Sequence, residues 1–137
     1  MARILCIDYG LKRTGIAVTD PLQIIATGLT TVDSKKLIPF LKDYCKQEDV
    51  ESFVIGEPKN LDDSDTHATP LVKAIIEKLK KEFPNIPLKT VDERYTSKMA
   101  KQAMIDMGMK KKDRRDKKTV DEIAAVIMLQ EYMQSIS

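Results

Sequence analysis

The chain has 137 residues, of which 32% are charged and 42% hydrophobic, the composition of a soluble globular protein. We expect one domain, residues 1–137, which is too short for two lobes that clasp a nucleotide. The net charge is only +2, but residues 110–118 hold seven basic and two acidic side chains and form a local basic segment. No apolar run is long enough to span a bilayer and no signal peptide opens the chain, so we expect no membrane partner and a cytoplasmic location.

Three strands are expected before the first helix. The apolar run Ile4–Ile7 predicts a strand that is buried on both faces and ends at the carboxylate of Asp8. A polar turn between two glycines follows, and Ile16–Val18 resumes an apolar strand, so this pair predicts a hairpin. Residues 23–32 are rich in β-branched side chains and predict the third strand.

Helical and strand patterns alternate over the rest of the chain. This order predicts an α/β fold with a mixed five-stranded sheet, in which the first three strands are antiparallel, the first strand lies near the middle and helices cover both faces. The expected elements are a helix over 37–44, a strand over 52–56, a helix over 71–83, a strand over 87–91, a helix over 99–107 and a last helix that begins at Thr119 with a capping box formed by Thr119 and Glu122.

Three acidic residues occupy positions where a solubilising role is not the only explanation. Asp8 ends a buried strand, Glu93 directly follows another strand, and Asp121 falls in the first turn of the last helix. A charge at the end of a buried strand is costly unless a metal ion, a basic neighbour or exposure compensates it. Structural explanations exist for the other two, because Glu93 can pair with Lys89 or Arg94 and Asp121 can complement the helix dipole.

The last helix favours a functional role for Asp121. Ala125, Met128 and Tyr132 share its helical face and are small or apolar, which indicates that this face points inward. The three carboxylates would then meet at the carboxyl end of the sheet, where ligands of open α/β sheets bind. Crowded carboxylates repel one another, and two Mg²⁺ or Mn²⁺ ions held there would relieve the repulsion and support phosphodiester cleavage.

Other reactive side chains do not form a recognisable site. Cys6 lies in a predicted buried strand and Cys45 on a predicted helix, and two unpatterned cysteines predict neither a disulfide framework nor a zinc site. The single histidine, His67, lies in a polar loop, where a surface role is expected. A Gly-x-Ser-x-Gly elbow is absent, so a mechanism without a protein nucleophile is expected.

Four motifs together resemble the YqgF family in their order and spacing. They are DYGLKRTGIAVTD at 8–20, G-x-P at 56–58, DERYTS at 92–97 and VDEIAAVIMLQEYM at 120–133. Members of that family are described as Holliday junction resolvases or pre-16S rRNA nucleases with an RNase H-like fold. The resemblance implies that Asp8, Glu93 and Asp121 are the catalytic carboxylates and that they bind Mg²⁺ or Mn²⁺.

The basic residues suit a polyanionic substrate. Arg13 in the hairpin and Arg94 are candidates for positioning the scissile phosphate, although Arg94 can also be a structural ion-pair partner. The segment 110–118 can bind phosphates or form a solvated loop. Tyr9 and Tyr95 can stack on bases, but core packing is the more common use of such aromatics. The predicted substrate-binding residues are Lys12, Arg13, Arg94, Lys112, Arg114 and Arg115.

Two other function classes fit part of the pattern. The spacing D-x-G-x-x-x-x-G at 8–15 also resembles the first phosphate loop of actin-like ATPases and sugar kinases, but the chain is too short for their second lobe. A nucleic-acid-binding module without activity would have no reason to gather acids beside phosphates.

We therefore expect a nuclease of structured nucleic acid that processes the 5′ end of pre-16S rRNA in association with the ribosome. The alternative is a Holliday junction resolvase that acts on branched DNA. A resolvase makes two symmetric cuts and predicts a two-fold dimer, whereas RNA trimming needs only a monomer, so the expected state is a monomer or a weak homodimer.

Overall fold

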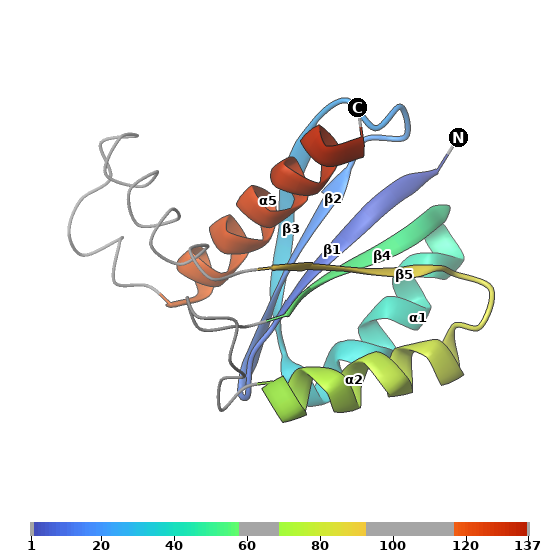
Figure 1. Ribbon diagram of the computed structural model, residues 1–137. Helices are drawn as coiled ribbons and strands as arrows, with labels where there is room; N and C mark the ends of the chain where they lie inside the picture. Colours follow the sequence, from blue (N-terminus) through green and yellow to red (C-terminus); the bar gives the residue numbers. More distant parts are fainter. Residues whose placement is uncertain (1, 58–68, 93–116, 137) are drawn as a thin grey trace.

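A computed structural model describes residues 2–57, 69–92 and 117–136. Helices and strands alternate after an opening run of three strands, as the sequence patterns predict (Figure 1). The elements are β1 (Arg3–Tyr9), β2 (Arg13–Thr19), β3 (Ala26–Asp33), the short 3-10 helix η1 (Ser34–Lys36), α1 (Leu37–Gln47), β4 (Val50–Glu57), α2 (Thr69–Glu82), β5 (Leu88–Asp92) and α5 (Lys117–Ile136).

The strands form one mixed sheet in the order β3-β2-β1-β4-β5. The β1–β2 and β2–β3 pairs are antiparallel, and the β1–β4 and β4–β5 pairs are parallel. This arrangement confirms that the first three strands are antiparallel and that β1 is central. Since β1, β4 and β5 are parallel, their carboxyl ends lie at one edge of the sheet, and α5 begins on that side of the molecule (Figure 1).

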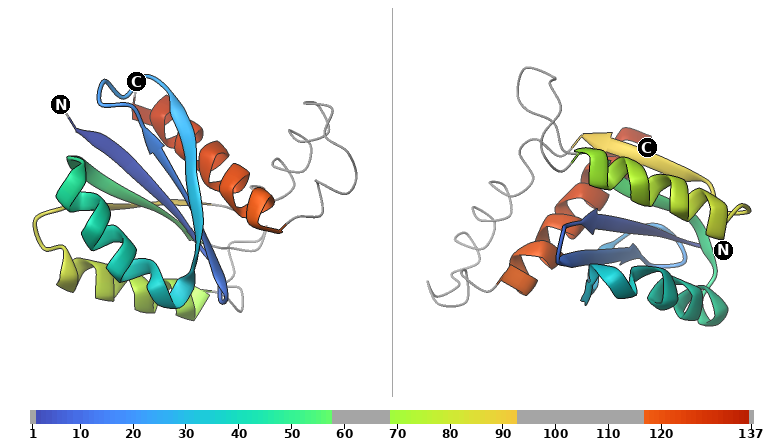
Figure 2. Two further views of the ribbon diagram at one scale, coloured as in Figure 1. Left: turned by 180° about the vertical axis from the view of Figure 1, so that it is seen from behind. Right: turned by 90° about the horizontal axis from the view of Figure 1, so that it is seen from below.

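Helices cover both faces of the sheet, which divides the core into two layers (Figures 1 and 2). Side chains alternate between the two faces along a strand, so neighbours in β1 enter different layers. Leu5 and Ile7 pack with α1 and α2, whereas Ile4 and Cys6 pack with α5. All four are at most 1% exposed, which explains why β1 reads as an unbroken apolar run.

The third strand begins at Ala26, three residues later than the sequence pattern predicts. The carboxylate of Asp20 accepts hydrogen bonds from the backbone N–H groups of Ile24 at 2.7 Å and Ile25 at 2.8 Å. Gln23, which directly precedes Ile24, has a φ of 58°. This left-handed conformation interrupts an extended strand. The β-branched residues here therefore belong to a turn, because local side chain to backbone bonds compete with the sheet.

The last helix begins at Lys117, so the predicted capping box is wrong. Thr119 is the third residue of α5 and cannot be its N-cap, because an N-cap residue precedes the helical backbone. The predicted helix over 99–107 lies outside the described residues. Within the described part of the chain, no helix is long and apolar enough to cross a membrane.

Candidate active site

Asp8 lies near the carboxyl end of the central strand, on the face that α5 covers. It is two residues beyond Cys6, which packs with α5, and strand alternation gives both side chains the same face. The residue opposite Asp8 in β2 is Gly15, which in turn lies opposite Thr31 in β3. Asp8 itself is half-buried. A partly desolvated carboxylate therefore sits at the edge where the parallel strands end.

Glycines occupy the positions beside Asp8 in both neighbouring strands. Gly15 is its partner in β2. In β4, Gly56 follows Ile55, which is the partner of Ile7. Neither glycine places a side chain next to the carboxylate, whereas any other residue type would.

Arg13 is one of two predicted phosphate-binding residues in the described part of the chain, and the strand register relates it to Asp8. It is two residues before Gly15 in β2, so it is a diagonal neighbour of Asp8 on the same face. Diagonal neighbours in an antiparallel pair are about 7–8 Å apart, which a long side chain can span. Lys12, the other predicted cation of the hairpin, is exposed in the turn.

A buried pair of hydroxyls fixes the turn that follows Asp8. The hydroxyl of Ser34 donates to the carbonyl oxygen of Gly10 at 2.6 Å, and its backbone N–H donates to the carbonyl oxygen of Lys12 at 3.0 Å. The hydroxyl of Thr14 lies 2.8 Å from that of Ser34. Thr14 and Ser34 are 0% and 7% exposed. These bonds tie the β1–β2 turn to the start of η1, and sequence reasoning missed them because an isolated Thr or Ser gives no signal of a partner 20 residues away.

Asp121 is the fifth residue of α5, and its side chain lies outside the described part of the structure. The inward direction predicted for its helical face is confirmed by its neighbours on that face. Ala125 and Met128 are both 0% exposed, and Tyr132 is half-buried against the same cluster.

The adjacent residue, Glu122, shows how closely α5 approaches β3. A Cβ atom placed on Gly28 would overlap the Glu122 carboxylate. The glycine in β3 therefore permits the close approach that brings the first turns of α5 onto the sheet.

The remaining predicted site residues lie outside the described residues. Asp92 is the last residue of β5, and Glu93 follows it in the sequence. In the described ranges there is no group of three or more His, Cys, Asp and Glu side chains that could hold a metal ion. The three-carboxylate set therefore stays a prediction. The residues outside the description are Glu93, Arg94, Tyr95, Lys112, Arg114, Arg115 and His67.

The cysteines do not contribute to this site. Neither forms a disulfide, and Cys6 is buried in the sheet whereas Cys45 is half-buried on α1. Burial raises the pKa of the Cys45 thiol above its ordinary value, so the thiol stays protonated at neutral pH and is a poor metal ligand.

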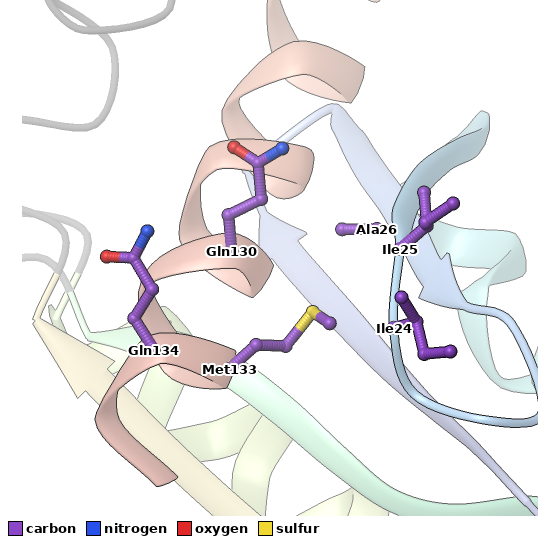
Figure 3. Close-up of a pocket in the computed structure, with 6 residues that line it drawn as sticks. All are labelled: Ile24, Ile25, Ala26, Gln130, Met133 and Gln134. Atoms are coloured by element: carbon purple, nitrogen blue, oxygen red, sulfur yellow. The ribbon is translucent and has the colours of Figure 1, made fainter. Parts of the chain in front are cut away.

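A pocket of about 440 Å³ lies away from Asp8, between α5 and the start of β3 (Figure 3). Met133 of α5 points toward Ile24 across it, and Gln130, Gln134, Ile25 and Ala26 also line it (Figure 3). No charged residue lines this pocket, so its chemistry does not suit a phosphate. Asp20, near this end, holds the turn described above, which is a structural role.

Comparison with known proteins identifies the family. The model of the RuvX family, described as Holliday junction resolvase, matches residues 2–135. Relatives named "Putative pre-16S rRNA nuclease" include a protein from Christiangramia forsetii, which is 55% identical over 133 residues that cover 97% of this chain and 98% of the relative. A protein of the same name from Flavobacterium psychrophilum is 54% identical, with 97% of each chain covered.

Solved structures of resolvases share the fold. RuvC of T. thermophilus in complex with a Holliday junction matches with a TM-score of 0.58 and 14% identity, covering 99% of this chain and 96% of that one. The resolvase of Fowlpox virus with junction DNA matches with a TM-score of 0.57 and 16% identity, covering 98% of each. These matches confirm the predicted RNase H-like fold. Because the family model spans nearly the whole sequence, this protein belongs to the RuvX family, the same family as the YqgF proteins that its motifs resemble.

Proposed function

We propose that this protein is a metal-dependent nuclease that hydrolyses phosphodiester bonds in structured RNA and processes the 5′ end of pre-16S rRNA in the cytoplasm. The names of its full-length relatives support this substrate. The observation that carries the proposal is the position of Asp8, a half-buried carboxylate at the end of the central strand, between two glycines and on the face of α5.

Glu93 and Asp121 are the proposed partners of Asp8. Glu93 directly follows Asp92, the last residue of β5, in the sequence. It is two residues beyond Val91, which packs in the α5 layer. Asp121 belongs to the helix that covers this face.

The chemistry of these donors fits a hard divalent cation. The proposed set offers only carboxylate oxygens, which Mg²⁺ and Mn²⁺ prefer. Gly15 directly opposite Asp8 in β2, and Gly56 after Ile55 in β4, have no side chains that would fill the space beside its carboxylate. When bound, two such ions would supply an activated water and stabilise the leaving oxygen.

The rest of the site positions the substrate. Arg13, diagonal to Asp8, would hold a non-bridging phosphate oxygen with its guanidinium, and Lys12 would add charge from the exposed turn. Ser34 fixes that turn through the carbonyl groups of Gly10 and Lys12. Arg13 and Lys12 would thus hold the phosphate beside the carboxylates, and the hydrogen bonds of Ser34 would keep their backbone in place.

The test presents purified protein and Mn²⁺ with labelled pre-16S rRNA ends, duplexes and four-way DNA junctions. Asp8→Asn and Glu93→Gln should each lower cleavage of the RNA end by at least about 100-fold, because even residues that only orient a ligand cost 10–100-fold. Asp20→Asn is the matched control, since its carboxylate serves a turn elsewhere. Cleavage that survives both site substitutions would show that the carboxylates are not the site.

A second candidate is cleavage of four-way DNA junctions, which the description of the matching family favours. Two symmetric cuts require a two-fold dimer, in which each copy brings one active site. Sedimentation of the protein with and without a junction separates the candidates. A monomer that trims RNA and leaves junctions intact supports the RNA substrate, and a junction-bound dimer that cuts both strands supports the alternative.

A further inference from the structure

A second pocket lies at the same edge of the sheet as Asp8, but on the opposite face. It has a volume of about 380 Å³, within the range of about 300–1,000 Å³ typical of small-molecule sites. Tyr9 forms its wall on the sheet side, and η1, α1 and α2 form the other walls. The lining residues that matter here are Tyr9, Lys35, Ile38, Leu71, Ile75 and Lys78.

The charge of this pocket suits an anion. Lys35 and Lys78 are both exposed, and no acidic residue is among its lining residues. Among the described residues, the ion pairs Arg3–Glu48 and Lys42–Glu82 involve neither of these two lysines. Glu82, one turn beyond Lys78 on α2, is bonded to Lys42 of α1 at 2.9 Å, and the nearby charge of Lys78 also helps to lower the pKa of the Glu82 carboxyl group. Glu82 does not line the pocket, and both lysines present exposed side chains at it that can contact phosphate oxygens.

The apolar side of the pocket suits a nucleobase. Tyr9 is half-buried, packs against the core of this face and lines the pocket. Leu71 is 38% exposed and lines the same pocket. A rigid aromatic ring beside apolar side chains is the surface on which unpaired bases stack.

The pocket is built before any ligand binds. The Lys42–Glu82 ion pair joins α1 to α2, the helices that form two of its walls. Asp33 accepts a hydrogen bond from the backbone N–H of Lys35 at 3.0 Å and so fixes the start of η1. Preformed walls lower the ordering cost of binding.

The pocket lies next to the proposed catalytic carboxylate Asp8 along β1. Asp8 and Tyr9 are consecutive in β1, and consecutive side chains of a strand point to opposite faces. A strand of nucleic acid that is cut beside Asp8 and continues over the edge of the sheet would reach Tyr9 next. We propose that the pocket of Tyr9, Lys35 and Lys78 holds one unpaired nucleotide of the substrate flank, with its base on Tyr9 and Leu71 and its phosphates on the two lysines. This inference rests on the proposed nuclease function for the identity of the flank.

The experiment measures binding in EDTA, so that cleavage does not interfere. Fluorescent 12-nucleotide single strands of RNA and of DNA, and a duplex of the same sequence, are titrated over a range of salt concentrations. Lys35→Ala/Lys78→Ala is compared with Lys46→Ala/Lys81→Ala, which removes the same charge from the last turns of α1 and α2, away from the pocket.

The pocket variant should bind single strands more weakly than the control variant, and its slope of log K against log[salt] should be smaller by about 1.4, the value for two lost phosphate contacts on a single strand. Tyr9→Leu should weaken binding by about fivefold or more, the loss of one stacked base. The arm that is affected, RNA, DNA or both, identifies the source of the nucleotide. Equal affinities and slopes in the pocket and control variants, or an equal loss for the duplex, would overturn the proposal.

The outcome is separable from that of the proposed function. If wild-type protein cleaves no substrate with Mn²⁺ but single-strand binding still depends on Lys35 and Lys78, the nuclease proposal fails and the pocket stands. If wild-type protein cleaves and the pocket variant binds like its control, only the pocket fails.

Discussion

The hydroxyl oxygens of Thr14 and Ser34 lie 2.8 Å apart, although 20 residues separate them in the sequence. Since the hydroxyl of Ser34 donates to the carbonyl oxygen of Gly10, its oxygen is left to accept from Thr14. Ser34 is thus the centre of a chain of bonds that holds the turn between Asp8 and Arg13.

The two hydroxyls should differ in their effect on stability. Ser34→Ala removes a donor and leaves both the Gly10 carbonyl and the Thr14 hydroxyl unsatisfied, which should cost about 1–3 kcal/mol. Thr14→Val keeps the shape and the Ser34–Gly10 bond, and it should cost about 1 kcal/mol. Urea denaturation measures both free energies of unfolding. A cost for Thr14→Val equal to or above that for Ser34→Ala would contradict this order.

The close approach of Gly28 and Glu122 predicts a non-additive pair of substitutions. Gly28→Ala places a Cβ where the Glu122 carboxylate lies, so the Glu122 side chain must move. Because the overlapping atoms belong to the end of a flexible side chain, we expect a loss below about 1 kcal/mol. In a Glu122→Ala background the same change should be neutral or stabilising, because Ala is better than Gly within a strand. Equal effects of Gly28→Ala in the two backgrounds would show that the contact does not limit packing.

Met128 tests how far the stability of the fold depends on α5. It is 0% exposed and packs with residues of β1, β2 and β4. Met128→Ala should cost about 2–5 kcal/mol through lost burial and a cavity. Gln130→Ala, an exposed position on the same helix, should change stability by less than about 0.5 kcal/mol. Thermal denaturation of both variants provides the comparison, and a Met128→Ala protein as stable as the control would show that α5 is loosely attached.

Acid should destabilise the protein in part through Asp20. Hydrogen bonds from the backbone N–H groups of Ile25, Ile24 and Leu22 hold the pKa of Asp20 below its ordinary value of 3.8. The unfolded chain therefore binds a proton at a higher pH than the folded chain, and the stabilisation is complete above pH 3.8 and lost as the pH falls through the lower folded pKa. Asp20→Asn should flatten the dependence of the melting temperature on pH below 3.8. An unchanged acid slope in the variant would exclude this contribution.

The order of strands and helices follows from local patterns and was predicted from the sequence. Alternating burial and helical periodicity report on neighbours a few residues away, which is why β1, β2, α1 and α2 were found near their true positions. The start of β3 was missed because Asp20 bonds to backbone groups four and five residues ahead, and apolar content does not report such bonds. The start of α5 was missed because its cap was inferred from residue types alone.

The sequence by itself determined that a carboxylate ends an apolar strand at Asp8 and that its motifs belong to one family. Only the tertiary structure decided what surrounds that carboxylate. The pairing register places Gly15 beside it, and the face of the sheet places it under α5. The fold also brings Lys35 and Lys78 to one pocket with Tyr9. These relationships join residues far apart in the chain. They depend on strand order, register and helix docking, which are set by burial over the whole molecule and not within any one segment.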